Sequence, residues 1–239
     1  MKIAFYFLIF GCSFPSVYGF DRIEGSPLNQ EVVRRLTAIL PEKPSILEAG
    51  TYDGEDTIEL SHLLPKAQIF TLEAVPELFN IAKETLKSYS NVETYNYALS
   101  DKTSNAIMYL SEWQEKPGIV GQSSSLLAPK EHLTYAPHIS FKRSIEVKTI
   151  TIDEWAERNG IKKIDFLKLD IQGNELNVLM ASPNILSTVK AILTEVEFVE
   201  AYEGQYLFED IKIWLEEQGF ELDSLFSQGW FGDALFIRK

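Results

Sequence analysis

The sequence predicts an α/β protein with a doubly wound, mostly parallel sheet and an antiparallel strand near the C-terminus. Short apolar runs, typical of buried strands, alternate with segments in which apolar residues recur at helical spacing. Pro and Gly are scattered along the 239 residues and do not gather into a linker, which favours one domain. Two apolar runs around Gly229 and Gly232 indicate a closing hairpin.

The expected elements follow one another from residue 27 onward. The first is a helix, which Pro41 and Pro44 end because proline cannot continue a helix. Five apolar runs are expected as parallel strands, over residues 45–49, 68–72, 92–98, 164–169 and 191–198. Helices are expected over residues 27–40, 55–64, 76–89, 176–180 and 207–215. The hairpin is expected to pair residues 220–226 with 234–237, and the alternation as a whole implies a parallel sheet.

One segment, residues 111–144, fits this alternation poorly because Pro, Gly and Ser interrupt it repeatedly. We interpret it as an insertion over the sheet, within a single domain of residues 20–239. After it, Thr151 and Glu154 have the spacing of a capping box, which predicts a helix start ahead of Trp155.

Composition excludes several kinds of partner and site. The formal net charge of −13 and the low pI argue against nucleic-acid binding, which needs clustered Lys and Arg. Cys12 is the only cysteine and lies in the apolar N-terminal segment, so the folded body has no disulfide and no cysteine-based zinc site. A metal would need carboxylates or histidines, and we assign no metal ligands.

The strongest functional signal is the segment of residues 46–54. An apolar strand ends there in Glu48, and Gly50 and Gly54 bracket the following turn ahead of a helix. In an open α/β sheet such a turn borders the crevice where nucleotides bind, and glycine lets the backbone approach a ligand closely. Neither the dinucleotide fingerprint nor the phosphate loop is present, so a pyrophosphate cradle is not indicated. Short turns of this kind are nevertheless common in α/β proteins.

Acids at the strand ends suggest what the crevice holds. Glu73 ends the second strand, and its two oxygens match the vicinal diol of a ribose. Glu48 is placed to face an ammonium group, while the turn amides around Asp53 would face a carboxylate. Ala98 and Asp101 follow the third strand, where an adenine edge would lie. A ribose and a zwitterion without pyrophosphate describe S-adenosylmethionine better than NAD.

A longer motif, residues 164–179, resembles the signature of the FkbM family of methyltransferases. It is a strand ending in Lys168-Leu169-Asp170, followed by Ile171-Gln172-Gly173-Asn174-Glu175 and an apolar helix start. The resemblance continues over roughly residues 45–238. It implies a Rossmann-like class I methyltransferase fold, S-adenosylmethionine as cofactor, and commonly O-methylation of a sugar or another hydroxylated metabolite. Tyr52 stands where many members carry Asn, so contacts to the methionine end are expected to differ.

Two acids are the candidate catalytic residues. Asp170 is expected at the crevice, where it could accept the proton of the acceptor hydroxyl or orient it, although a helix-capping role is the alternative. Glu195 is the second candidate, because period two along its strand points it toward the same edge. His132 and His138 could reach over the crevice from the insertion, and Trp113, Tyr135 and Phe141 could stack on a sugar or only anchor the insertion.

Residues 1–19 are typical of a secretory signal, with cleavage expected before Phe20. An uncleaved anchor, which would be the chain's only membrane contact, and a misassigned start remain alternatives. Export or anchoring conflicts with a cofactor kept in the cytosol, so the compartment stays open. A second hypothesis is therefore an exported, non-catalytic binding protein that retains the methyltransferase fold. A nicotinamide-dependent dehydrogenase is a distant third, and oligomeric state is not predicted.

Overall fold

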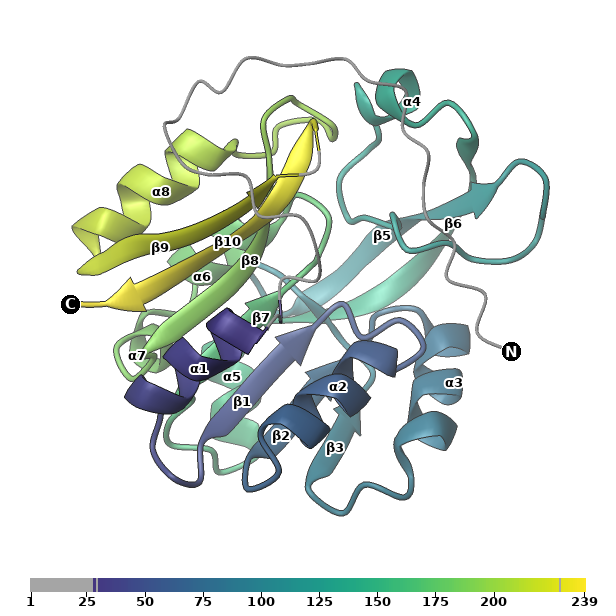
Figure 1. Ribbon diagram of the computed structural model, residues 1–239. Coiled ribbons are helices and arrows are strands. Elements are labelled where there is room, and N and C mark those ends of the chain that lie inside the picture. Colours follow the sequence, from purple (N-terminus) through teal and green to yellow (C-terminus); the bar gives the residue numbers. More distant parts are fainter. Residues whose placement is uncertain (1–27, 29, 228) are drawn as a thin grey trace.

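The computed structural model describes residues 28, 30–227 and 229–239, which form a large central sheet, a smaller second sheet and the surrounding helices (Figure 1). The expected leader of residues 1–19 and its cleavage point lie outside the described residues. Within the described part of the chain, no helix is both long and apolar enough to cross a membrane.

The central sheet has seven strands in the order β3-β2-β1-β7-β8-β10-β9. They are β1 (Ser45–Ala49), β2 (Gln68–Leu72), β3 (Val92–Tyr95), β7 (Phe166–Leu169), β8 (Ala191–Glu197), β9 (Phe220–Ser227) and β10 (Phe231–Arg238). The first five pair in parallel, whereas β10 runs antiparallel to both β8 and β9. This order confirms the predicted doubly wound, mostly parallel sheet with an antiparallel C-terminal strand.

Helices cover both faces of this sheet because its central strands are apolar on both sides. The helices are α1 (Gln30–Ile39), α2 (Glu55–Leu63), α3 (Pro76–Leu86), α5 (Ile152–Arg158), α6 (Glu175–Met180), α7 (Pro183–Leu186) and α8 (Phe208–Glu217). Successive residues of β1 face opposite ways, as a period of two requires. Ile46 packs in the core cluster that includes α1 and α2, and Leu47 packs in the cluster that includes α5 to α8.

The second sheet corrects one expectation and shows what the irregular segment contains. It consists of β4 (Ala98–Leu99), β5 (Ser104–Trp113) and β6 (Ile139–Ile150) in the order β4-β6-β5, and α4 (His132–Tyr135) lies between β5 and β6. The third parallel strand was predicted to run to residue 98, but β3 ends at Tyr95 and Ala98 pairs with Thr149 of the second sheet. The irregular segment 111–144 starts inside β5 and ends inside β6, which form one long antiparallel hairpin.

This hairpin lies beyond the carboxyl ends of the central strands, where a ligand crevice is expected (Figure 1). Met108 and Val147 of the hairpin pack with Val75 and Leu78 near the start of α3. Tyr52, in the turn after β1, packs against the same cluster, and its hydroxyl donates a hydrogen bond to Val120 O at 3.3 Å. The second sheet is thereby fastened to the turn that follows β1.

The helix predicted ahead of Trp155 is confirmed. Thr151 is the N-cap residue of α5, and its Oγ1 accepts a hydrogen bond from Glu154 N at 3.1 Å. Trp155 is fully buried and meets the rings of Phe70 and Tyr95 edge-on. This helix thus anchors the end of the hairpin to the central sheet.

Candidate active site

A cavity of about 720 Å³ opens between the central sheet and the second sheet. Its lining comes from the carboxyl ends of β1, β2, β7 and β8, from the start of α3, from the second sheet with α4, and from the turn between β9 and β10. This volume is in the range of sites that bind small molecules and cofactors. Of the candidate site residues, six line the cavity: Gly50, Asp53, Glu73, Ala98, Asp170 and Glu195.

The turn after β1 depends on glycine at position 50. Gly50 has a φ of +89°, and a Cβ added there would lie 1.8 Å from Asp170 O, so the two strand ends approach each other closely only with glycine. Gly54 also has a positive φ, but it is the N-cap residue of α2 and does not line the cavity. Its contribution is to the geometry of the turn.

Several amides of this turn donate hydrogen bonds inside the protein. Gly50 N and Thr51 N both donate to Leu72 O, at 3.2 and 3.4 Å, and Tyr52 N donates to Glu73. These three amides are therefore not free to face a ligand carboxylate in this geometry. They fix the turn against β2 instead. Asp53 does line the cavity, and its Oδ1 accepts a hydrogen bond from Glu55 N at 3.2 Å, which supports the start of α2.

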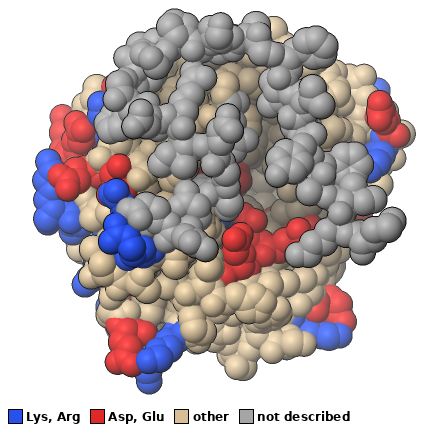
Figure 2. Space-filling model, in the orientation of Figure 1, with Lys and Arg blue, Asp and Glu red and all other residues tan. Residues whose placement is uncertain are grey.

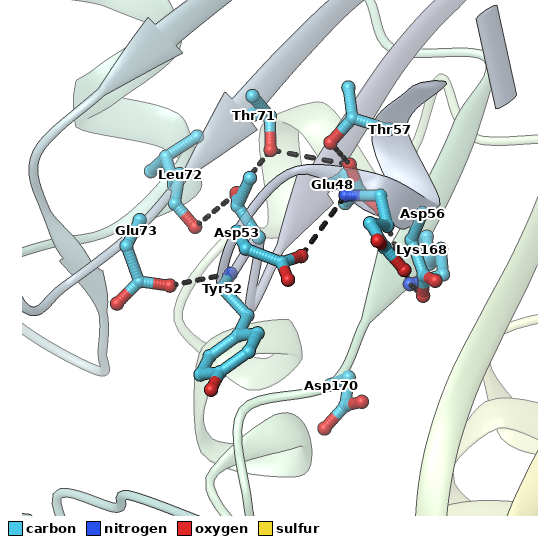
Figure 3. A network of polar contacts seen from close by, with 12 residues as sticks. Glu48, Tyr52, Asp53, Asp56, Thr57, Thr71, Leu72, Glu73, Lys168 and Asp170 are labelled. Carbon is cyan, nitrogen blue, oxygen red and sulfur yellow. Dashed lines mark hydrogen bonds and ion pairs between the residues drawn. The ribbon is translucent and has the colours of Figure 1, made fainter. Parts of the chain in front are cut away.

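Glu73 is held at the cavity wall by two backbone amides. Its Oε2 accepts from Tyr52 N, as Figure 3 shows, and its Oε1 accepts from Val75 N, each at 2.8 Å. The residue is 7% exposed. Burial raises the pKa of Glu73 to about 7, although the amide hydrogen bonds act in the opposite direction. The result is an oriented carboxyl group that changes charge close to neutral pH.

Glu48 has a different place from the one expected. It is fully buried, does not line the cavity, and lies opposite Lys168 in the register of β1 and β7. Its Oε1 is 3.2 Å from Lys168 Nζ, and its Oε2 accepts hydrogen bonds from Thr57 and Thr71 (Figure 3). The predicted contact with a ligand ammonium is thus replaced by an internal ion pair, because the cation comes from a distant strand that local spacing does not reveal.

Lys168 is the centre of this buried network. Its Nζ also contacts Asp56 Oδ2 at 2.9 Å. Burial lowers the pKa of Lys168, but Glu48 and Asp56 outweigh that effect, so the pKa is raised and the ammonium form is kept.

The two candidate residues after the third strand differ in their position relative to the cavity. Ala98 is buried and lines the cavity beside Tyr97 and Leu99, which gives it an apolar wall. Asp101 is exposed and lies outside the cavity lining, and its Oδ1 accepts a hydrogen bond from Ser100 Oγ at 3.1 Å. The structure therefore places Ala98, but not Asp101, where it could contact a ligand.

Asp170 and Glu195 meet through one side chain, as their expected placement at one edge of the sheet requires. Gln172 Nε2 donates to Asp170 Oδ1 at 2.8 Å and to Glu195 Oε2 at 2.5 Å. Gln172 Oε1 accepts a hydrogen bond from Tyr202 Oη at 2.6 Å, and the residue has a φ of +57°, which is rare outside glycine. Gln172 stood in the sequence motif, but no local signal marked Tyr202, which is thirty positions away.

Several carboxyl groups share this part of the molecule, and their environment opposes ionisation. Burial first, then Asp170 and other carboxylates, raise the pKa of Glu195 well above its ordinary value. Burial likewise raises the pKa of Glu175 to about 8 and that of Asp233 to about 7, with Asp170 adding to both. Among the described residues, no group of three or more acids, histidines or cysteines is arranged to bind a metal ion.

The second sheet and α4 supply aromatic side chains to the cavity. His132 is buried and its Nδ1 has no hydrogen-bond partner; burial, then His138, lowers the pKa of His132 to about 4, so its imidazole is neutral at physiological pH. His138 lines the cavity too, and its ring lies 4.9 Å from that of Trp113. Phe141 does not line the cavity but packs edge-on against His132.

The strand order and this crevice define a Rossmann-like α/β domain of the methyltransferase class. Residues 48–222 match the model of the methyltransferase FkbM domain, so the chain belongs to the FkbM family of methyltransferases.

Curated relatives agree with this assignment, and a solved structure shares the fold. The 2-O-methyltransferase NoeI of Sinorhizobium fredii is 31% identical over 211 residues, which is 87% of this chain and 86% of the relative. The hexuronic acid methyltransferase AglP of Haloferax volcanii is 25% identical over 168 residues, covering 70% of this chain and 62% of the relative. A fibrillarin/Nop5p complex shows a similar fold at a TM-score of 0.51 and 12% identity, over 87% of this chain and 79% of that chain.

Proposed function

We propose that this methyltransferase uses S-adenosylmethionine to O-methylate a hydroxyl group on a sugar, a glycan or another small metabolite. The observation that carries the proposal is the cavity itself. In this cavity the oriented carboxyl of Glu73 and the strand-end acid Asp170 line one space in a chain of the FkbM family. The names of NoeI and AglP, which refer to a 2-O position and a hexuronic acid, support a sugar as the acceptor.

The residues of the cavity fit this cofactor. Each oxygen of Glu73 uses one lone pair for a backbone amide, so the other remains for a ribose hydroxyl. Apolar side chains on the same wall suit an adenine ring: Leu78, Ala98, Leu99 and Met108. Asp53 lies in the turn between these groups and α2, where it could meet the ammonium group that we first assigned to Glu48.

Bound S-adenosylmethionine would supply a methyl group on a sulfonium centre, which an acceptor oxygen attacks in line. The protein has to align that oxygen and accept its proton. Asp170 lines the cavity and, held by Gln172, is our candidate for the proton acceptor. Glu195 shares the same amide and would assist as a neutral carboxyl that orients the hydroxyl, because its raised pKa opposes ionisation.

Calorimetry with S-adenosylmethionine and S-adenosylhomocysteine is the direct test of the cofactor. We expect both to bind, and an absence of heat at millimolar ligand would refute the proposal.

Asp170→Asn should keep the affinity for S-adenosylhomocysteine and lower turnover by about 100-fold or more. Asp101→Asn is the matched control, since Asp101 is exposed and outside the cavity. Equal turnover of the two variants would remove Asp170 from the chemistry.

Family membership favours catalysis over a non-catalytic binding role.

The compartment stays a prediction, because residues 1–19 have the composition of a leader but a cytosolic cofactor favours the cytoplasm. N-terminal sequencing of the mature chain from its native cells tests it, with a new terminus at Phe20 expected if the leader is removed.

A further inference from the structure

The part of the cavity lining that comes from the strand ends and from the start of α2 is acidic. Six acids contribute to it, and among the described lining residues there is no Lys or Arg: Asp53, Glu55, Asp56, Glu73, Asp170 and Glu195. Acidic side chains also gather near the middle of the face shown in Figure 2. Bound S-adenosylmethionine carries a single net positive charge, which offsets only one carboxylate. Asp56 contacts Lys168 and Glu195 resists ionisation, which leaves Glu55 and Asp170 to act on the electrostatics of the acceptor.

Lys168 lies on β7, two positions before Asp170, but it is not free to bind an anion. Its side chain is 6% exposed, and its Nζ already contacts Glu48 Oε1 at 3.2 Å and Asp56 Oδ2 at 2.9 Å. Moving it toward a ligand would leave Glu48 as an unpaired buried charge, which is costly. The cavity thus offers no described cation to an acceptor that carries a carboxylate or a phosphate.

The region around Glu195 already resists one more negative charge. Burial raises the pKa of this residue well above its ordinary value, and Asp170 and Glu197 raise it further. An anionic group on the acceptor would be repelled by the same carboxylates. A site that keeps one of its own carboxyl groups neutral is poorly suited to a charged acceptor.

The opposite wall, which comes from the second sheet, α4 and the turn between β9 and β10, suits an uncharged sugar ring. Tyr135 and Trp230 are stacked with centroids 5.9 Å apart, Trp113 lies against His138, and all four line the cavity. Flat aromatic faces pack well against the apolar C–H face of a sugar. Amide and hydroxyl side chains that can bind sugar hydroxyls line the same wall: Gln122, Ser123, Ser124 and Thr134.

We infer that the acceptor is an electrically neutral sugar residue, and that the cavity discriminates against sugars with a carboxylate or phosphate on the methylated ring. This inference rests on the proposed function. It sets this chain apart from what the name of AglP states for that protein, a hexuronic acid as the group acted on.

The test uses matched sugars that differ only at C6, where the uronide has a carboxylate in place of a neutral hydroxymethyl group. Methyl transfer from radiolabelled S-adenosylmethionine is measured with methyl glucoside against methyl glucuronide, and with methyl galactoside against methyl galacturonide. We expect kcat/KM for each uronide to be lower by about 100-fold, the effect of like charges roughly 6 Å apart at an effective dielectric constant of about 20. Saturation-transfer NMR with the S-adenosylhomocysteine-loaded protein reads binding of the same sugars without turnover, and should detect the neutral members alone.

A pair of variants tests whether charge is the cause. Glu55 lines the cavity, so Glu55→Lys should reduce the preference for the neutral sugar by about 10-fold or more. Glu217→Lys makes the same change on an exposed position at the end of α8 outside this cavity, and should leave the preference unchanged. Calorimetry with S-adenosylhomocysteine on both variants checks that the cofactor side is intact.

Uronides that are used or bound as well as the neutral sugars would overturn the inference. So would a protein that binds S-adenosylhomocysteine but neither binds nor methylates any neutral sugar, and that result would leave the cofactor assignment standing. A protein that does not bind S-adenosylhomocysteine would count against the proposed function itself.

Discussion

Replacing Lys168 with Met should destabilise the protein strongly, because the change leaves Glu48 as a buried carboxylate without its cation. Glu48 is 0% exposed, and its Oε1, which has no hydrogen-bond partner, forms an ion pair with Lys168 Nζ at 3.2 Å; Met fills a volume similar to that of Lys. Removing one member of a buried ion pair costs about 3–5 kcal/mol. That is a large part of the free energy of unfolding of a typical domain, about 5–15 kcal/mol.

Two further variants separate the charge effect from a packing effect. The double change Glu48→Gln with Lys168→Met removes the unpaired charge, so it should recover a large part of the loss. Lys66→Met breaks an exposed ion pair with Glu42, and should cost less than about 1 kcal/mol.

Urea unfolding followed by circular dichroism measures all four proteins under one set of conditions. The reasoning predicts the order wild type, Lys66→Met, the double variant and then Lys168→Met, from most to least stable. A Lys168→Met protein within about 1 kcal/mol of wild type would refute the assignment of Lys168 as the necessary partner of Glu48.

Three other predictions concern the cavity directly. Gly50→Ala should cost about 3 kcal/mol or more in urea unfolding, because the new Cβ meets Asp170 O, whereas Gly118→Ala, with open space around it, should cost about 1 kcal/mol. Affinity for S-adenosylmethionine should fall between pH 8 and pH 6, since Glu73, with a pKa of about 7, loses its charge on acidification; titration calorimetry of Glu73→Gln should show no such dependence. Gln172→Ala should lower kcat by about 10-fold or more with unchanged affinity for S-adenosylhomocysteine, and an unchanged kcat would exclude a positioning role.

The central sheet was accessible from the sequence because its strands are continuous apolar runs between helical segments. Leu47 and Leu167, for example, are wholly buried in such runs. The hairpin of the second sheet was missed although its strands carry a signal. In β6, exposed Ser144, Glu146 and Lys148 alternate with Ile145 and Val147, which is typical of a half-solvated antiparallel strand, and residues 106–110 of β5 form an apolar run. The Pro, Gly and Ser residues between the two strands led instead to the expectation of one irregular segment over residues 111–144.

The candidate site, too, could be predicted from the sequence only in part. Glu73 and Asp170 were found because each is the last polar residue at a strand end, a feature that is local in sequence. The true partner of Glu48 was not found, because register between β1 and β7 joins residues 120 positions apart. Tyr202 was missed for the same reason. Long-range pairing decides which strand-end acids face the ligand and which are neutralised inside the fold.

The cavity has two walls of separate origin. One wall comes largely from the strand ends of the central sheet and holds the polar groups proposed for the methyl donor, while the other comes largely from residues 104–150, a hairpin with its own hydrogen-bonded strands. Exchange of this hairpin replaces only Met108 among the groups proposed for the donor, so acceptor range and donor use can diverge largely independently during evolution. A chimaera that carries the corresponding segment of a relative should acquire that relative's acceptor while keeping this chain's affinity for the donor.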